Sequence, residues 1–121
     1  MNDVSAALHT AAVNRAARVL EGQKLQVLDR NWTSGQHHLD LVVTPGSDIL
    51  AAVEVAIMIQ GSEGASVATL TESRFRQVTD AAREWKRQRE ALFGDLWVIL
   101  VSVDPAGGTA VATGNTATGV A

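Results

Sequence analysis

ILAAVEVAIMI, residues Ile49 to Ile59, is the stretch of sequence that decides the fold. Every residue in it except Glu54 is apolar. A strand this apolar has both of its faces covered by other elements, as central strands do in α/β proteins. Burying a carboxylate in such a strand is costly unless it meets a counter-charge, a metal ion or water. The stretch therefore predicts a central strand and makes Glu54 a candidate functional residue.

Two further strands are predicted before this stretch. Residues 24–29 (KLQVLD) alternate between apolar and polar side chains, which is typical of a half-buried strand. Residues 37–44 (HHLDLVVT) form a second strand, and Pro45 and Gly46 after it are a turn signal. Three consecutive strands with short connections favour an antiparallel meander.

Two helices and a last strand complete the expected fold. Apolar residues recur every three or four positions in residues 5–21 and again in residues 70–92, which predicts two amphipathic helices. Residues 96–103 (LWVILVSV) predict a buried strand that the second helix can carry to a parallel partner. The predicted order is helix, three strands, helix, strand. This is a small α/β sandwich with a mixed sheet flanked by helices.

The composition bounds the class of protein. A chain of 121 residues with 46% hydrophobic and 19% charged residues is ordinary for one globular domain. The final 17 residues, 105–121, carry no charge and are rich in Gly, Ala and Thr, so they offer little to bury. The sequence thus predicts one domain over residues 1–104, followed by a flexible tail.

Charge and cysteine content restrict the partners and the compartment. The formal net charge of −3 gives no general attraction to nucleic acid, so binding a polyanion would need a local patch. The absence of cysteine excludes disulfides and suits a reducing cytoplasm, where we expect the protein. The N-terminus lacks the pattern of a signal peptide, and no apolar window is long enough to span a membrane.

The spacing of two carboxylates suggests a metal site. If the second and third strands pair around the turn at Pro45 and Gly46, Asp40 and Glu54 come close to opposite each other. Two convergent carboxylates at a sheet edge suit Mg²⁺ or Mn²⁺, which bind oxygen ligands and water. The alternative is that each carboxylate lies at a strand end and faces water.

Histidine offers a variant of this site. His38 shares a strand face with Asp40 because side chains alternate along a strand. A cluster of His38, Asp40 and Glu54 would favour Mn²⁺ or Zn²⁺ over Mg²⁺, since imidazole suits transition metals. The alternative is an exposed pair, His37 and His38, at the start of the strand. His9 stands alone on the first helix and carries no signal.

Several of these segments resemble one protein family when read in order. ARVLEGQKLQVLDRNW (residues 17–32), LDLVV (39–43) and VEV (53–55), followed by a helix that opens TESRFRQ (71–77), resemble the YraN-like proteins of bacteria. The resemblance runs from about residue 11 to residue 103. It implies the restriction-endonuclease-like fold, whose nucleases carry a PD-(D/E)xK signature.

The sequence departs from the family pattern at positions that matter for catalysis. The resemblance implies Gly-Glu in the first helix, where this sequence has Ala12 and Val13, and lysine two residues after Glu54, where it has Ala56. In nucleases of this kind the metal ion lowers the pKa of a bound water. The lysine positions that water or stabilises transition-state charge, and losing such a group costs roughly 10²–10³ in rate. Ala56 can do neither, whereas Arg74 matches a family lysine position and is the candidate replacement.

The second helix holds six of the ten basic residues of the chain. Arg76, Arg83 and Arg87 fall on the face opposite the apolar stripe, and they form a candidate phosphate-contacting surface. Asp80 and Glu84 border the same face, however. The alternative is therefore a solvated helix face whose charges pair with one another.

Three functions remain open at this stage. The first is a non-catalytic protein with a nuclease-like fold and no cofactor, which binds DNA or RNA or serves as a protein-interaction or dimerisation module. The second is a Mg²⁺- or Mn²⁺-dependent nuclease in which Asp40 and Glu54 hold the ion and Arg74 or His38 replaces the lysine. The third is a purely structural partner with an apolar patch around Trp97 or residues 57–59.

Overall fold

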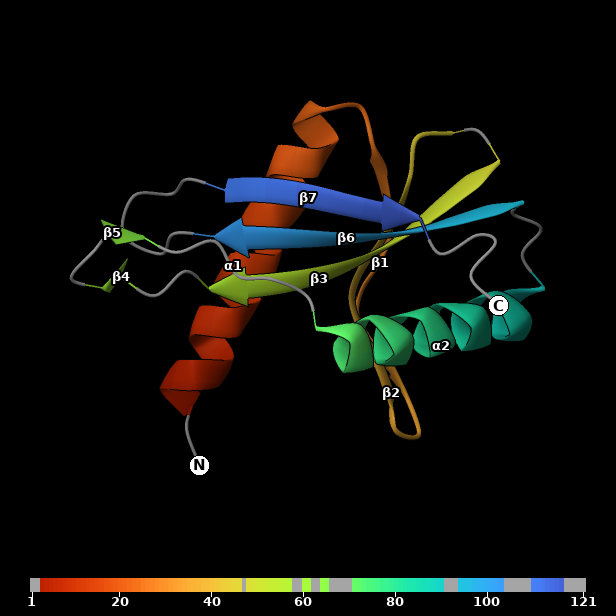
Figure 1. Ribbon diagram of the computed structural model, residues 1–121, viewed down its shortest axis with the longest axis horizontal. Coiled ribbons are helices and arrows are strands. Elements are labelled where there is room, and N and C mark those ends of the chain that lie inside the picture. Colours follow the sequence, from red (N-terminus) through yellow and green to blue (C-terminus); the bar gives the residue numbers. More distant parts are fainter. Residues whose placement is uncertain are drawn as a thin grey trace.

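The computed structural model describes residues 3–46, 48–57, 60–61, 64–65, 71–90, 94–103 and 110–116. Its elements in chain order are α1 (Asp3–Gly22), β1 (Gln26–Ser34), β2 (His37–Thr44), β3 (Ile49–Ile57), β4 (Gln60–Gly61), β5 (Gly64–Ala65), α2 (Glu72–Arg89), β6 (Asp95–Val103) and β7 (Ala110–Thr116). Figure 1 shows their arrangement. Neither of the two helices described is long and apolar enough to cross a membrane.

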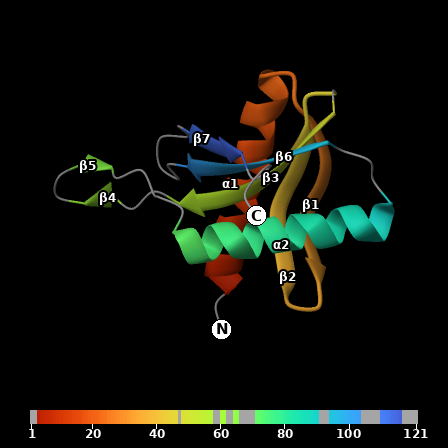
Figure 2. The same cartoon turned by 45° about the vertical axis from the view of Figure 1, so that its right-hand side comes forward.

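Five strands form one mixed sheet in the order β1-β2-β3-β6-β7. The pairs β1–β2, β2–β3 and β6–β7 are antiparallel, and β3–β6 is parallel, with α2 as the crossover between the parallel strands. The two helices lie on opposite faces of this sheet (Figures 1 and 2). The predicted order of helix, three strands, helix and strand is confirmed, and so is the mixed sheet flanked by helices.

The core consists of two apolar layers that share the central strand β3. Toward α1, the buried side chains include Val13, Ala16, Leu20, Leu41, Val43, Val53 and Val55. Toward α2, they include Leu39, Val42, Leu50, Ala52, Val78, Ala82, Trp85 and Val98. Alternate residues of β3 enter the two layers, so its apolar sequence reflects burial on both faces, as predicted. By the same alternation Glu54 faces α2.

The hairpin of β1 and β2 bends where its outer half leaves the sheet. Leu39 packs in the layer of α2 while Leu41 packs in the layer of α1, although both hold odd positions of β2. The pairing between β2 and β3 runs from Val43 to Leu41, whereas the pairing with β1 continues to His37. In β1, a register shift lies between Val27 and Asp29. Asp40 lies at this bend, between the two leucines.

The bend also appears in the backbone of β1. Asn31 adopts φ 47°, a left-handed conformation that asparagine tolerates better than most residues. It lies between the residue pairs Arg30–Leu41 and Trp32–Leu39. An irregular residue at this point turns the hairpin and increases its twist. The hairpin therefore extends past the edge of the sheet beside α2 (Figure 2).

Residues 105–121 differ in part from the flexible tail that their composition predicts. Ala110–Thr116 form β7, which pairs with β6 from Trp97 to Val103. The physical reason is that β6 would otherwise present a row of unpaired backbone N–H and C=O groups. A short strand of uncharged residues can satisfy them through its backbone alone. The rest of this stretch lies outside the described residues.

Candidate functional site

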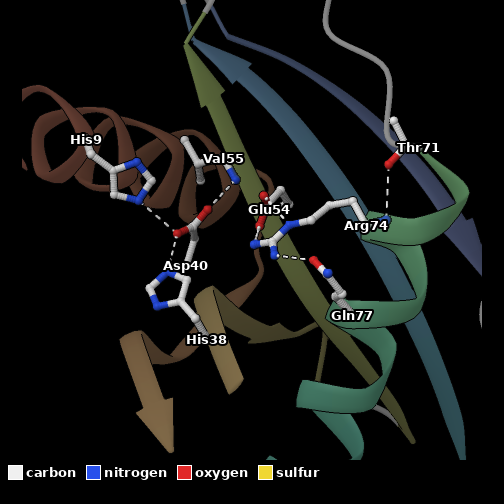
Figure 3. Close-up of polar contacts among 8 residues, drawn as sticks. All are labelled: His9, His38, Asp40, Glu54, Val55, Thr71, Arg74 and Gln77. Atoms are coloured by element: carbon white, nitrogen blue, oxygen red, sulfur yellow. Dashed lines mark hydrogen bonds and ion pairs between the residues drawn. The ribbon is translucent and has the colours of Figure 1, made fainter. Parts of the chain in front are cut away.

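Asp40 is a buried carboxylate that joins three elements of the fold. Only 2% of its surface is exposed. Its Oδ2 accepts a hydrogen bond of 2.7 Å from the backbone N–H of Val55 in β3. Its Oδ1 lies 2.7 Å from Nε2 of His38 and 2.9 Å from Nε2 of His9, which comes from α1 (Figure 3). These three partners offset the cost of burying the carboxylate.

His9 is the residue that sequence reasoning missed. It stands four positions before Val13 and seven before Ala16, and both of these residues are fully buried against the sheet. Positions with this spacing share one face of a helix. Following the apolar face of α1 one turn further toward its N-terminus would have placed His9 over the sheet. The interpretation of His9 as a residue without a signal was therefore wrong.

Glu54 faces α2 and forms an ion pair with Arg74. Nε of Arg74 donates to Oε2 at 2.8 Å, and Nη2 donates to Oε1 at 2.9 Å, so both carboxylate oxygens are engaged. Nη1 donates to Oε1 of Gln77 at 3.0 Å. The hydrogen bonds to Glu54 raise the pKa of Arg74, burial opposes this, and the charges of Glu54 and Asp40 add to the rise. Arg74 is therefore a fixed positive charge.

The start of α2 holds this arginine in place. Thr71 precedes the helix in an extended conformation, and its hydroxyl oxygen accepts a hydrogen bond of 3.1 Å from the backbone N–H of Arg74. This is the usual role of an N-cap residue. The cap fixes the first turn of α2, from which the side chain of Arg74 reaches across to β3 (Figure 3).

The two carboxylates singled out by their spacing bind different partners. The β2–β3 pairing ends at Leu41 with Val53. Asp40 precedes Leu41 and Glu54 follows Val53, so the two carboxylates lie next to the end of this antiparallel pairing. Figure 3 shows Asp40 with the two histidines on one side of β3 and Glu54 with Arg74 on the other. Within the described part of the chain, the ligand atoms that gather within 4.8 Å of one another belong to His9, His38 and Asp40. Glu54 is not in this group.

The residues therefore do not fit the magnesium site that the resemblance implies. Mg²⁺ needs carboxylate oxygens that converge on one point and are free to bind it. Both oxygens of Glu54 are held by a guanidinium, whose positive charge opposes a divalent cation beside it. The structure thus brings His38 to Asp40 and Arg74 to Glu54, but it does not assemble Asp40 and Glu54 around a shared ion.

A hollow connects these two pairs at the surface. Its volume is about 260 Å³, and it opens between the β1–β2 hairpin and the first turns of α2. The lining residues are Gln36, His37, His38, Arg74, Gln77 and Asp80. The imidazole that contacts Asp40 and the guanidinium that holds Glu54 thus face the same hollow. Most of its lining side chains can donate hydrogen bonds.

The basic face of α2 is paired within the helix. Arg76 lies 2.5 Å from Glu72, Arg83 lies 3.9 Å from Asp80, and Arg87 contacts Glu84. Each arginine of the candidate phosphate-contacting surface therefore has a carboxylate one helical turn away. The structure shows the arrangement expected for a salt-bridged, solvated helix face.

The hypothesis of a purely structural partner predicts an exposed apolar patch around Trp97 or residues 57–59. Trp97 is 39% exposed on β6, which makes it one of two large hydrophobic residues exposed in the described chain, with Leu8 at 48%. These two residues belong to different elements, β6 and α1. In the other predicted patch, residues 58 and 59 and the side chain of Ile57 lie outside the described part of the chain.

Comparison with known proteins identifies the family. The family model described as "Uncharacterised protein family UPF0102" matches residues 14–101. A UPF0102 protein of Nocardioides sp. is 30% identical over 88 residues, which cover 73% of this chain and 70% of that protein. The matched residues include Asp40, Glu54 and Arg74, whereas His9 precedes them. The resemblance to YraN-like proteins is thereby confirmed: the chain belongs to the UPF0102 family.

Proposed function

We propose that this protein is a non-catalytic relative of the nucleases of its fold and binds nucleic acid through a backbone phosphate at the hollow beside α2. The observation that carries the proposal is the ion pair between Arg74 and Glu54. It engages the carboxylate that a metal-dependent nuclease would need for its ion. The residue two positions on is Ala56, which has no charge to offer. For the chemistry implied by the resemblance, Glu54 is thus already engaged by a guanidinium and the lysine is absent.

The hollow offers donors that suit a phosphate group. Arginine and glutamine side chains contact phosphate oxygens in nucleic-acid complexes, and a histidine N–H can donate to them as well. Arg74, His38 and Gln77 supply these three types within one hollow. Among the described residues of the lining, Asp80 is the only one with a carboxylate, and it lies near Arg83. Because the net charge is −3 and the outer arginines of α2 are paired, we expect weak binding that falls steeply with salt.

The test compares two variants that lower the net charge equally. Gln77→Glu places a negative charge in the hollow and keeps an oxygen that can accept from Arg74. Arg76→Gln removes a positive charge from the outer face of α2, outside the hollow. Binding of fluorescent single-stranded, duplex and branched DNA, and of RNA, is measured by anisotropy at low and at physiological salt. We expect Gln77→Glu to weaken binding by about tenfold and Arg76→Gln to change it little, because only the first alters the phosphate contact.

Two results would contradict this proposal. Binding that weakens in Arg76→Gln and not in Gln77→Glu would move the contact to the outer face of α2. The absence of binding to every nucleic acid at low salt would remove the nucleic-acid function altogether. Protein partners would then be the remaining candidates.

A metal-dependent nuclease is the second candidate, and one observation favours it. Asp40 is buried and oriented by a backbone N–H, and Arg74 faces the hollow beside it. Cleavage of the same nucleic acids is measured with Mg²⁺ and with Mn²⁺, with Asp40→Asn as the matched control. We expect no cleavage above this control. Cleavage by the parent that disappears in Asp40→Asn would overturn the non-catalytic assignment and make Arg74 the next residue to replace.

A further inference from the structure

We propose that His9, His38 and Asp40 form a binding site for a divalent transition-metal ion, with Zn²⁺ as the best-suited ion. The site uses Nε2 of each histidine and Oδ1 of the aspartate. Glu54 takes no part in it, so this site differs from the one that the paired carboxylates first suggested. It does not depend on nucleic-acid binding and can be tested without it.

The distances between the three ligand atoms are close to those around a bound Zn²⁺, so only small movements of the side chains are needed. The two Nε2 atoms lie 2.9 Å and 2.7 Å from the same oxygen of Asp40. Around a tetrahedral Zn²⁺ with bonds of about 2.0–2.2 Å, neighbouring ligand atoms lie about 3.4 Å apart. Each contact would therefore lengthen by about 0.5–0.7 Å. The side chains of His9 and His38 are 40% and 35% exposed, which leaves them room to make this movement.

The arrangement of the rings supports convergence on one point. The ring centroids of His9 and His38 are 6.4 Å apart and the rings are tilted by 49°, so they are not stacked on each other. Instead, both direct Nε2 toward Asp40 (Figure 3). When each imidazole carries its proton on Nδ1, the lone pair of Nε2 faces the point where an ion would bind.

Asp40 is already held in the orientation that a metal ligand needs. Its Oδ2 accepts from the backbone N–H of Val55, which directs Oδ1 toward the histidines. Hydrogen bonds of this kind, made by the atom that does not bind the metal, orient ligands in known sites. A backbone donor in the central strand cannot rotate away. The carboxylate would therefore enter metal binding without losing conformational freedom.

The ligand types determine the class of ion. Two imidazoles and one carboxylate form the set used by several catalytic zinc sites and by non-haem iron sites. Mg²⁺ and Ca²⁺ prefer oxygen ligands, so they are not expected here. Three protein ligands leave at least one coordination position open. Such a position suits water or an anion.

The experiment measures Zn²⁺ binding to the full chain without a histidine tag. Isothermal titration calorimetry gives the affinity and the stoichiometry, and the visible absorption of bound Co²⁺ reports its coordination. His9→Gln and His38→Gln keep a side-chain amide that can donate to Asp40 but remove the imidazole. The matched control is His37→Gln, because His37 borders the hollow without belonging to the cluster.

We expect one Zn²⁺ per chain, and binding at least about tenfold weaker in His9→Gln and in His38→Gln than in the parent or in His37→Gln. Zn²⁺ should also raise the melting temperature of the parent and of His37→Gln only. Circular dichroism without metal verifies that each variant is folded. Equal binding in His9→Gln and the parent, or no binding to the parent, would overturn the proposal. The two histidines would then serve only to offset the buried charge of Asp40.

Discussion

Asp40 connects segments that are far apart in the chain. One carboxylate contacts His9, which is 31 residues away, and the backbone of Val55, which is 15 residues away. A group with so many partners leaves several donors unsatisfied when it is removed. Its contribution to stability is therefore best measured by changing the charge and the acceptor oxygen separately.

We expect Asp40→Ala to destabilise the protein more than Asp40→Asn. The alanine leaves the N–H of Val55 buried without a partner, at a cost of about 1–3 kcal/mol in the free energy of unfolding. The asparagine keeps an oxygen that can accept from this N–H, but it loses the charge and places an NH₂ group where Oδ1 faces the two histidines. Urea denaturation of the three proteins measures the difference. Equal losses in both variants would show that the charge of Asp40 matters and its backbone contact does not.

Some of the site could be predicted from single residues. The spacing around the Pro45–Gly46 turn indicates that Asp40 and Glu54 are neighbours, and the structure places them directly after the last β2–β3 pair. Their choice of partners could not be predicted in this way. It depends on the bend between Leu39 and Leu41, which turns Asp40 toward α1 while Glu54 faces α2. A regular alternation of side chains does not contain that bend.

At the scale of elements, α2 combines two roles on different faces. Its buried face packs on the sheet through residues such as Val78 and Trp85, and its outer face carries the salt bridges. Its last turn is fixed to β1 as well, because Trp85 Nε1 and Arg89 both donate to Asp29 at 3.0 Å and 2.7 Å. Arg89 also stacks over the ring of Trp85 at 4.5 Å. Asp29 of β1 thus holds the last turn of α2 against the sheet.

The ion pair between Glu84 and Arg87 on the outer face of α2 predicts how stability changes at low pH. Hydrogen bonds from Arg87, and next from Gln88, lower the pKa of Glu84 to about 2 from an ordinary value of 4.5. A lowered pKa means that this pair contributes to stability fully above pH 4.5, and that the contribution disappears as the pH falls through about 2. In Arg87→Gln we expect the pKa of Glu84 to return toward 4.5, as measured by an NMR titration of its carboxyl carbon.

Arg76→Gln is the control for this titration, because Arg76 pairs with Glu72 and not with Glu84. It should leave the pKa of Glu84 unchanged. High salt should shift the pKa of Glu84 upward in the parent, since the pair lies at the surface and is screened. An unchanged pKa of Glu84 in Arg87→Gln would mean that a group other than Arg87 lowers it.

For the whole molecule, the order of elements could be predicted because burial leaves a periodic pattern. Apolar residues recur every three or four positions in α1 and in α2, and they form continuous runs in β3 and β6. Each of these patterns indicates one element. Strand β7 could not be predicted in this way, because pairing through the backbone leaves no such pattern. His9 differs from β7 in this respect. Its spacing from Val13 and Ala16 indicates that it lies on the buried face of α1, whereas its contact with Asp40 also depends on how α1 crosses the sheet.

A truncated protein that ends at Val103 lacks β7 and tests what this strand contributes to stability and to the monomeric state. We expect the truncated protein to have a lower urea midpoint, because the backbone groups of β6 lose their partners along seven residue pairs. We also expect it to self-associate through the uncovered edge. Size-exclusion chromatography with light scattering measures the second effect. A truncated protein that remains monomeric and equally stable would show that β7 does not protect the sheet.

Strand β1 forms the opposite edge of the sheet, where self-association through unpaired backbone groups is also possible. Irregular backbone and charged residues oppose it there. Along its length the strand carries the register shift after Val27, the left-handed Asn31 and the charged residues Asp29 and Arg30. A second chain that approached this edge would find no straight row of backbone groups to extend. The bend that brings Asp40 to the histidines thus also discourages growth into fibrils. One distortion of the hairpin both shapes the site and helps to keep the protein from aggregating.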